Sequence, residues 1–245
     1  MTTDPKGTQD EIIKLNSYFK NRGIDTDYYL SFQLPQYLKD ELPTDKSAPI
    51  LDIGCGFGQM LLRLKDEGFT QLNGVDIGNE SVDFCNSVGL NVSLITSIQS
   101  YAAQNQAKYK LILMSHVLEH IPKDQTIETV QAIKSLLAPG GSYIVMVPNA
   151  QSNTGVYWMY EDFTHHLLFT AGSLIYVLKS AGFEKIEFLD PKCLAGLSSI
   201  QRFKRKLLLR LYEIRLNFWN RATASSFHKP SPRIYSFELK AKATL

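Results

Sequence analysis

Short apolar segments alternate with helix-type segments between residues 49 and 189, and this alternation limits the possible folds more than any other feature. The helix-type segments carry apolar residues at helical spacing, and several end at a glycine, such as Gly68, Gly89 or Gly182. Strands that alternate with helices form a mostly parallel sheet with helices on both faces. We therefore predict a doubly wound α/β fold. Its strands are expected at 49–53, 72–77, 91–95, 110–114, 142–147, 185–189 and 233–243, and its helices at 60–65, 81–88, 124–137 and 173–180.

The chain divides into four parts. A length of 245 residues fits one large domain with an appendage. Residues 48–191 contain the alternating segments and form the predicted core, to which residues 233–245 add a last strand. Residues 1–47 are predicted to be a helical lead-in, and residues 192–232 interrupt the alternation as a helical insertion.

Composition and the first residues favour a protein of the cytoplasm. The three cysteines are too few and too far apart for a disulfide framework, as expected in a reducing compartment. The chain starts with polar and acidic residues rather than a basic and then apolar signal sequence. No apolar run approaches the roughly 20 residues that span a bilayer. The formal net charge of +2 indicates no class of partner.

The segment from Leu51 to Gly58 (LDIGCGFG) is the strongest sign of a bound cofactor. A buried strand leads into three alternating glycines and then a helix, so backbone N–H groups can face a ligand without intervening side chains. Gln59 stands where the dinucleotide fingerprint has its third glycine. Asp52 would repel a pyrophosphate, whereas it suits the positive charge of S-adenosylmethionine (SAM). The turn therefore favours SAM over NAD, with a purely structural glycine turn as the alternative.

A second carboxylate, Asp76, ends the second predicted strand. It lies roughly 20 residues beyond the glycines, where a carboxylate can accept hydrogen bonds from the hydroxyls of a ribose. An acid at the N-terminus of a helix is the structural alternative. Together with the glycine turn, Asp76 indicates a nucleoside-type ligand.

These motifs are similar to those of class I SAM-dependent methyltransferases, in the broad group that includes ubiquinone-biosynthesis enzymes and sugar methyltransferases. The resemblance implies a Rossmann-like, seven-stranded sheet whose last strand is antiparallel. It also implies that SAM binds over Gly54, Gly56 and Gly58, with its ribose on Asp76 beside Ile77. The matching stretches follow in the expected order across residues 48–190 and read LDIGCGFG, GVDI, LILMSHVLEHIP, LAPGG, SYIVMVPN and AGFEKIEF.

The resemblance assigns two further loops to the cofactor. The adenine would lie near the loop at 96–99, which reads TSIQ where the family often has an aspartate. Ser97 or Gln99 would then make the contact with the adenine amine. After the fourth strand, His116 and Val117 would line the SAM side of the site.

The stretch from His116 to His120 (HVLEH) formally matches the zinc signature H-x-x-E-H. That signature requires a helix to bring both histidines to one metal, whereas here a buried strand precedes the stretch and Pro122 follows it. We therefore predict no metal site. Glu119 and His120 are expected to hold the loop together.

Residues 160–166 (YEDFTHH) follow the fifth strand, where such enzymes place residues that bind the acceptor. They resemble stretches in methyltransferases of O-antigen and capsule synthesis. A neutral imidazole can take the proton of an attacking hydroxyl. His165 is the predicted base, with Asp162 orienting its ring. His166 is the second candidate, and the structural alternative is that one of these histidines only packs or caps.

A basic amphipathic helix is predicted at residues 200–219. Such a helix can lie in the surface of an anionic membrane. The alternatives are that it packs on the core or on the second subunit of a homodimer. Nucleic-acid binding is not predicted, because the charges are confined to one leucine-rich helix. The apolar stripe consists of Ile200, Phe203, Leu207, Leu211, Ile214 and Phe218, and the basic residues are Arg202, Lys204, Arg205, Lys206, Arg210 and Arg215.

The predicted function is methyl transfer from SAM to a hydroxyl of an acceptor, preferably a sugar of an O-antigen or capsule precursor. One alternative is a quinone-type phenol or another small metabolite as the acceptor. A second alternative is a SAM-binding partner subunit without catalytic activity. The protein is expected in the cytoplasm, with peripheral contact to the inner face of the membrane.

Overall fold

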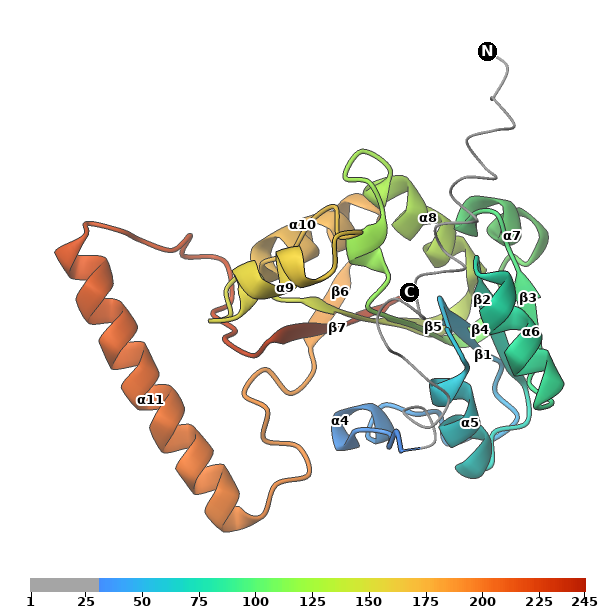
Figure 1. The fold of residues 1–245 in the computed structure, drawn as a ribbon, viewed down its shortest axis with the longest axis horizontal. Helices are drawn as coiled ribbons and strands as arrows, with labels where there is room; N and C mark the ends of the chain where they lie inside the picture. The colour runs from blue at the N-terminus through green and yellow to red at the C-terminus, as the bar shows by residue number, and fades with distance from the viewer. Residues whose placement is uncertain (1–30) are drawn as a thin grey trace.

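The computed structural model describes residues 31–245 (Figure 1), so most of the predicted helical lead-in lies outside the described residues. Within the remainder of that lead-in, helix α4 (Gln36–Lys39) follows Pro35 directly. Proline suits the start of a helix because its φ is fixed and it has no N–H to leave unpaired. Leu38 anchors this short helix, since its side chain is fully buried against the sheet.

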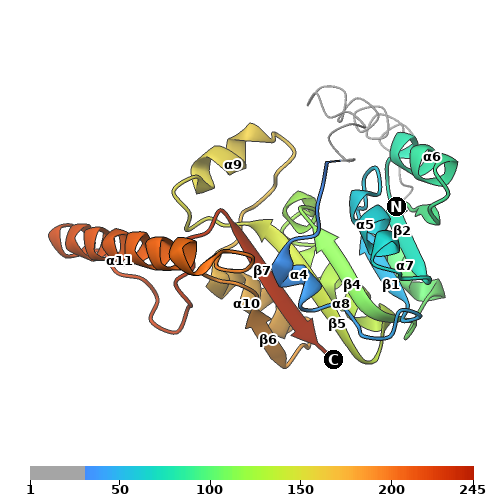
Figure 2. The ribbon, with the colours of Figure 1, turned by 90° about the horizontal axis from the view of Figure 1, so that it is seen from below.

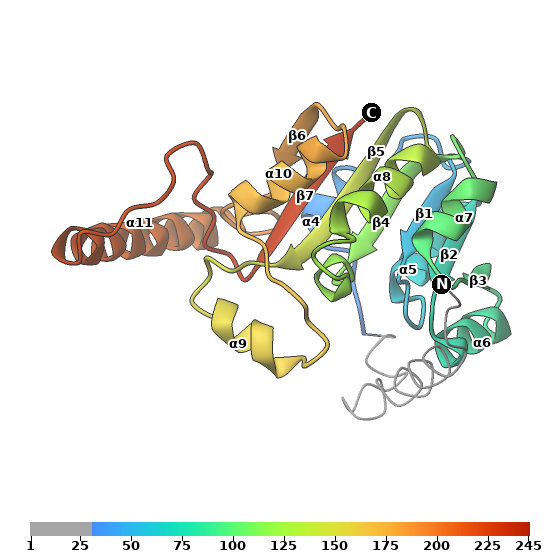
Figure 3. The same ribbon diagram turned by 90° about the horizontal axis from the view of Figure 1, so that it is seen from above.

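Within residues 31–245, seven strands pair into one sheet (Figure 3). They are β1 (Ile50–Ile53), β2 (Leu72–Asp76), β3 (Val92–Leu94), β4 (Tyr109–Ser115), β5 (Leu137–Pro148), β6 (Lys185–Phe188) and β7 (Glu238–Thr244). Their order in the sheet is β3-β2-β1-β4-β5-β7-β6. Strands β1 to β5 pair in parallel, whereas β7 runs antiparallel to both β5 and β6. The predicted mostly parallel, Rossmann-like sheet with an antiparallel last strand is confirmed.

Helices cover both faces of the sheet (Figure 2). One face carries α7 (Ile98–Gln104), α8 (Thr126–Leu136) and α10 (Ala171–Ser180). The other face carries α4, α5 (Gln59–Asp66) and α6 (Asn79–Ser87). Because the central strands are buried on both sides, β1, β4 and β5 are apolar along most of their length rather than alternating with polar residues.

The parallel strands direct four loops to one edge of the sheet. In a doubly wound fold, ligands bind outside the carboxyl ends of the parallel strands. At this edge, the chain leaves β1 through residues 54–58 and β2 through Ile77. It leaves β4 through the 3₁₀ turn η1 (Leu118–His120), and β5 through the segment before helix α9 (Gly155–Glu161). Most of the predicted cofactor residues belong to these loops, whereas Ser97 follows β3 and the predicted acceptor residues Asp162, His165 and His166 follow α9.

Four local elements differ from the prediction, and the first is the last strand, which starts at Glu238 rather than at residue 233. The predicted loop at 96–99 is partly helical, because the hydroxyl of Ser97 caps α7 by accepting a hydrogen bond from the N–H of Ser100. Strand β5 starts at Leu137 rather than at residue 142, since Gly140 takes a φ of 66° and the register against β4 shifts there. Helix α9 was not predicted at all.

The insertion forms one long helix, α11 (Ser199–Ala222), which projects from the core (Figures 1 and 2). Ser198 and Gln201 form a reciprocal capping box at its N-terminus. None of its residues is buried. Its Tyr212 hydroxyl donates a hydrogen bond to Asn153, which is one of its few contacts with the core. No helix within residues 31–245 is both long and apolar enough to span a bilayer.

Candidate active site

Three glycines shape the turn between β1 and α5. Gly54, Gly56 and Gly58 have φ values of 68°, 53° and 77°, in the left-handed region that favours glycine. A Cβ atom on Gly54 would lie 2.3 Å from Cγ2 of Val117, so the turn packs directly against the loop after β4. No side chain caps α5, which leaves its first N–H groups available to a ligand.

Asp76 holds this turn from the end of β2. Its Oδ2 accepts a hydrogen bond from the N–H of Gly56 at 2.9 Å, and its Oδ1 accepts one from the N–H of Gly78 at 2.8 Å. The side chain is buried, and burial raises the pKa of its carboxyl. The neighbouring Ile77 is 46% exposed at the same edge, as a contact residue for a ligand would be. The structure therefore joins two predicted cofactor residues, Asp76 and Gly56, directly.

Asp52 lies beneath the turn, inside β1. It is 3% exposed, and burial together with repulsion by Asp76 raises the pKa of its carboxyl to about 8. Without a positive charge nearby, a carboxyl with this pKa is largely protonated near neutral pH. A positively charged ligand beside it would favour its ionisation.

The two candidates for the adenine contact both have partners within the protein. Ser97 is engaged as the cap of α7, and Gln99 donates a hydrogen bond from Nε2 to Oγ1 of Thr129 at 3.2 Å. Their loop nevertheless lies beside the cofactor edge, because the N–H of Ile95 donates to the carbonyl of Asp76. The adenine contact of Ser97 stays a prediction.

His116 follows β4 in a left-handed conformation, with a φ of 54°. Its Nδ1 lies 3.3 Å from Oε1 of Glu119, and its Nε2 lies 3.3 Å from Oε2 of Glu238 on β7. Burial opposes a positive charge on this ring, but the two carboxylates outweigh it and raise the pKa of His116 to about 10. The two carboxylates therefore favour the imidazolium form of His116 over the neutral ring. Sequence reasoning missed Glu238, because only the sheet order brings β7 to this edge.

A cluster of histidines and carboxylates surrounds His165. Its Nδ1 lies 2.7 Å from the carbonyl oxygen of Trp158, and its Nε2 lies 4.0 Å from both Glu119 Oε1 and Asp162 Oδ2. The ring of His120 packs edge-on at a centroid distance of 4.7 Å. We call Glu119, His120, Asp162 and His165 the His–carboxylate cluster. Its members come from η1 and from the segment after α9, so only the fold brings them together.

The cluster changes the expected roles of several residues. Asp162 faces the Nε2 side of His165, whereas in a catalytic triad the orienting group binds Nδ1. Here the Trp158 carbonyl fills that position, and an orienting role of Asp162 stays a prediction. The side chain of His166 is exposed, and its backbone N–H donates to the carbonyl of Glu119.

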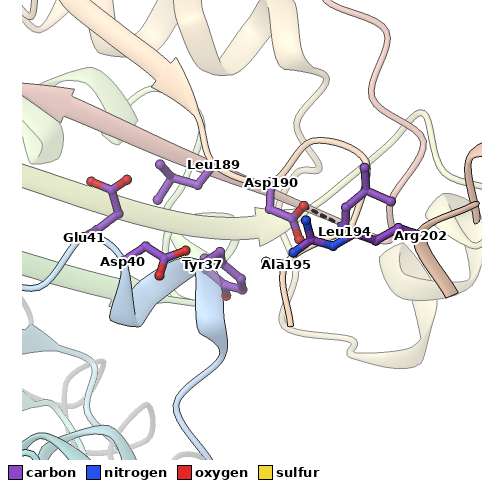
Figure 4. Close-up of a pocket in the computed structure, with 8 residues that line it drawn as sticks. All are labelled: Tyr37, Asp40, Glu41, Leu189, Asp190, Leu194, Ala195 and Arg202. Atoms are coloured by element: carbon purple, nitrogen blue, oxygen red, sulfur yellow. Dashed lines mark hydrogen bonds between the residues drawn. The ribbon is translucent and has the colours of Figure 1, made fainter. Parts of the chain in front are cut away.

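A separate pocket of about 280 Å³ lies where α4, the end of β6 and the start of α11 meet (Figure 4). Figure 4 shows Asp190 and Arg202 on one side of it and Tyr37 with Asp40 on the other. No residue of the glycine turn or of the His–carboxylate cluster lines this pocket. The pocket is lined by residues from both the core and the start of α11, and it is separate from the predicted cofactor and acceptor residues.

Comparison with known proteins agrees with this geometry. A family model described as a methyltransferase domain matches residues 27–187. A ubiquinone biosynthesis O-methyltransferase of Serratia proteamaculans is 32% identical over 97 residues, which cover 38% of this chain and 39% of that protein. The chain therefore spans less than half the length of the curated relatives that it matches.

Two solved structures share the fold. A SAM-dependent methyltransferase of Archaeoglobus fulgidus has a TM-score of 0.61 and 24% identity, covering 85% of this chain and 91% of that one. A second one, from Thermotoga maritima, has a TM-score of 0.58 and 16% identity, covering 94% and 98% of the two chains. Because the family model matches well over half of the sequence and the folds agree, the chain belongs to the methyltransferase-domain family, as a class I SAM-dependent methyltransferase.

Proposed function

We propose that this protein transfers a methyl group from SAM to a hydroxyl of its acceptor. The observation that carries the proposal is that two sets of residues meet at one edge of the sheet. The glycine turn with Asp76 fits SAM, and the His–carboxylate cluster fits a hydroxyl that must lose its proton. Val117 joins the two sets, since it packs on Gly54 and is followed in the same loop by Glu119.

The turn fits SAM in shape and in charge. Val117 packs on Gly54 and fixes the turn, the N–H groups of α5 are open, and Asp76 offers carboxylate oxygens for a ribose. When bound, SAM supplies a methyl group on a positively charged sulfur. The protein holds the acceptor oxygen in line with that methyl group and keeps water out. We assign the proton to Nε2 of His165, because the Trp158 carbonyl accepts a hydrogen bond from its Nδ1–H.

We propose a lipid-borne acceptor, with a sugar hydroxyl of an O-antigen or capsule precursor as the preferred case. The resemblance of residues 160–166 to enzymes of that synthesis supports the sugar, and the exposed surface of α11 supports the lipid. A quinone-type phenol is the second candidate, favoured by the name of the Serratia proteamaculans relative. The test is a screen with labelled SAM against nucleotide sugars, lipid-linked glycans and quinone precursors. Release of S-adenosylhomocysteine in the absence of any acceptor would contradict the proposal. Release without methylation of any of these acceptors would contradict it as well.

Helix α11 supports docking on an anionic lipid surface at the inner face of the membrane. Seven of its residues are basic and one is acidic, whereas the whole chain has a net charge of only +2. At 3.6 residues per turn, Lys204 and Arg215 flank the apolar stripe on one side, and Lys206 and Arg210 flank it on the other. A helix with this pattern lies in the membrane plane with its apolar side inserted. The stripe residues Ile200, Phe203, Leu207, Leu211, Ile214 and Phe218 are between 48% and 70% exposed.

The protein is expected to sediment with vesicles of phosphatidylglycerol and phosphatidylethanolamine. Replacing Lys204, Lys206 and Arg210 with glutamine should weaken this binding roughly 100-fold, because each basic residue contributes about 1 kcal/mol at such a surface. Added salt should weaken it too, since exposed charges are screened beyond about 8 Å at physiological ionic strength. Sedimentation at rising salt measures both effects.

A matched triple variant controls for the loss of charge. Lys65, Lys179 and Lys185 are exposed residues outside α11, so their replacement by glutamine should leave vesicle binding unchanged. If the protein does not bind vesicles at low salt but elutes as a dimer in size-exclusion chromatography, membrane docking is contradicted. The apolar stripe would then bind a second copy of the chain.

The affinity for SAM is expected to rise with pH up to about 8. The folded-state pKa of Asp52, about 8, lies above its ordinary value of 3.8, so the folded protein holds a proton that the unfolded chain releases. A positive ligand beside Asp52 expels this proton, so affinity should rise by up to about tenfold per pH unit below that pKa. By the same linkage, the ligand-free protein should lose stability as pH rises from roughly 4 to 8. Calorimetry across this range measures the change in affinity, and Asp52→Asn should remove it.

A further inference from the structure

We propose that Glu119, His120 and His165 bind a divalent cation beside the cofactor turn. Each residue offers one ligand atom, and the three atoms lie within 4.8 Å of one another. A cation that binds among them would draw the three atoms closer together. Two imidazoles and one carboxylate are a ligand set that first-row transition metals accept, and it leaves coordination positions open.

Glu119 gives an independent reason to expect a cation. Its side chain is 0% exposed, and neither carboxylate oxygen accepts a hydrogen bond from the described residues. Burial of an ionised carboxylate without donors is costly, so such a group usually has a cation or an ordered water as its partner. The nearest nitrogen is Nδ1 of His116, 3.3 Å from Glu119, and Nε2 of the same ring lies equally close to Glu238. The two carboxylates therefore share one imidazole ring, and Oε2 of Glu119 has no hydrogen-bond donor among the described residues.

Neighbouring groups fix both histidines in the state that binds metals. His165 donates its Nδ1–H to the Trp158 carbonyl, which leaves the lone pair on Nε2 toward Glu119. The hydroxyl of Thr164 donates to Asp162 Oδ1 at 2.6 Å, so it must accept from Nδ1–H of His120, 2.8 Å away. His120 then also keeps its lone pair on Nε2. Hydrogen bonds of this kind to the far ring nitrogen accompany most metal-binding histidines.

The inference rests on the proposed function and revises one part of it. An acceptor hydroxyl that coordinates the cation would have a lowered pKa and would release its proton to water. The resulting oxygen would form its bond to the methyl carbon as the carbon–sulfur bond breaks, and the electron pair would stay on sulfur. His165 then holds the cation instead of taking the proton. This arrangement also accounts for a histidine whose reactive nitrogen faces two carboxylates rather than solvent.

Titration with Mn²⁺, followed by electron paramagnetic resonance on protein stripped with EDTA, tests the site directly. We expect one tight site per chain. Glu119→Gln and His165→Ala should each weaken Mn²⁺ binding by about 100-fold or more, because the first removes the charge of a ligand and the second removes a ligand atom. The exposed Glu128 and His228 provide matched controls, so Glu128→Gln and His228→Ala should bind Mn²⁺ as the parent protein does. Calorimetry with SAM verifies that every variant is folded.

The outcomes separate the metal site from the proposed function. Tight Mn²⁺ binding, together with methyl transfer that EDTA abolishes and Mn²⁺ or Zn²⁺ restores, supports the inference. No stoichiometric binding of either ion overturns it, and so does binding that survives both Glu119→Gln and His165→Ala. Methyl transfer at full rate in EDTA also overturns it, while leaving the proposed function intact with His165 as the base.

Discussion

Replacing His165 with alanine is expected to lower kcat by about 10²- to 10⁴-fold while the Kd for SAM changes by less than about twofold. The Nε2 atom of His165 lies 4.0 Å from Glu119 and from Asp162, at the centre of the His–carboxylate cluster. No hydrogen bond joins its side chain to the described residues of the glycine turn, so cofactor binding should be spared. Turnover with labelled SAM and the identified acceptor, alongside calorimetry with SAM, measures the two quantities.

The matched control for His165→Ala is His166→Ala, because His166 is also a histidine and is the next residue in the chain. Its side chain is exposed, so we expect His166→Ala to lower kcat by less than about tenfold, well short of the loss typical of a general base. A larger loss at His166 than at His165 would show that the neighbour is the reactive residue. Parent-level rates in both variants would mean that alignment alone drives the reaction.

Replacing Asp76 with alanine is expected to weaken SAM binding by about 1–3 kcal/mol, or roughly 5- to 150-fold in Kd. The proposed ribose contacts would be lost. The N–H groups of Gly56 and Gly78 would also lose the carboxylate that now accepts from both, so the turn would no longer be held for the ligand. Calorimetry with SAM gives the change in affinity.

Asp83 supplies the control for Asp76, since it is an exposed acid on the adjacent helix α6. Asp83→Ala removes the same charge and should leave the Kd for SAM unchanged. Equal affinity in Asp76→Ala and the parent protein would exclude Asp76 from the cofactor site. A thermal melt of each variant checks that the loss at Asp76 does not come from unfolding.

The order of strands and helices could be predicted because it depends on local patterns. Apolar runs and helical spacing lie within single segments, and the antiparallel last strand came from the family resemblance. Helix α9 escaped prediction because its apolar and aromatic residues run consecutively from Val156 to Tyr160, so no helical spacing stands out. The early start of β5 escaped as well, because Pro139 and two glycines normally end regular structure.

The two halves of the candidate site differed in how far the sequence could predict them. The glycine turn is one contiguous strand–turn–helix unit, so its residues could be named from their spacing. The His–carboxylate cluster joins η1 to the segment after α9, and no spacing rule connects Glu119 with His165. The H-x-x-E-H stretch is indeed not part of an α-helix, since a 3₁₀ turn follows β4. The fold brings His165 to this stretch from the segment after α9. The zinc signature requires both histidines on one helix, so it could not reveal this contact.

The position of β7 sets an order in which the molecule can be completed during synthesis on the ribosome. Strand β6 pairs with β7 alone, yet β7 begins only after all of α11 has been made. The sheet therefore stays open at β5, with β6 unpaired, until β7 has been made and released from the ribosome. Helix α11 precedes β7 in the chain and has its own capping box, so its sequence is complete before the sheet can close.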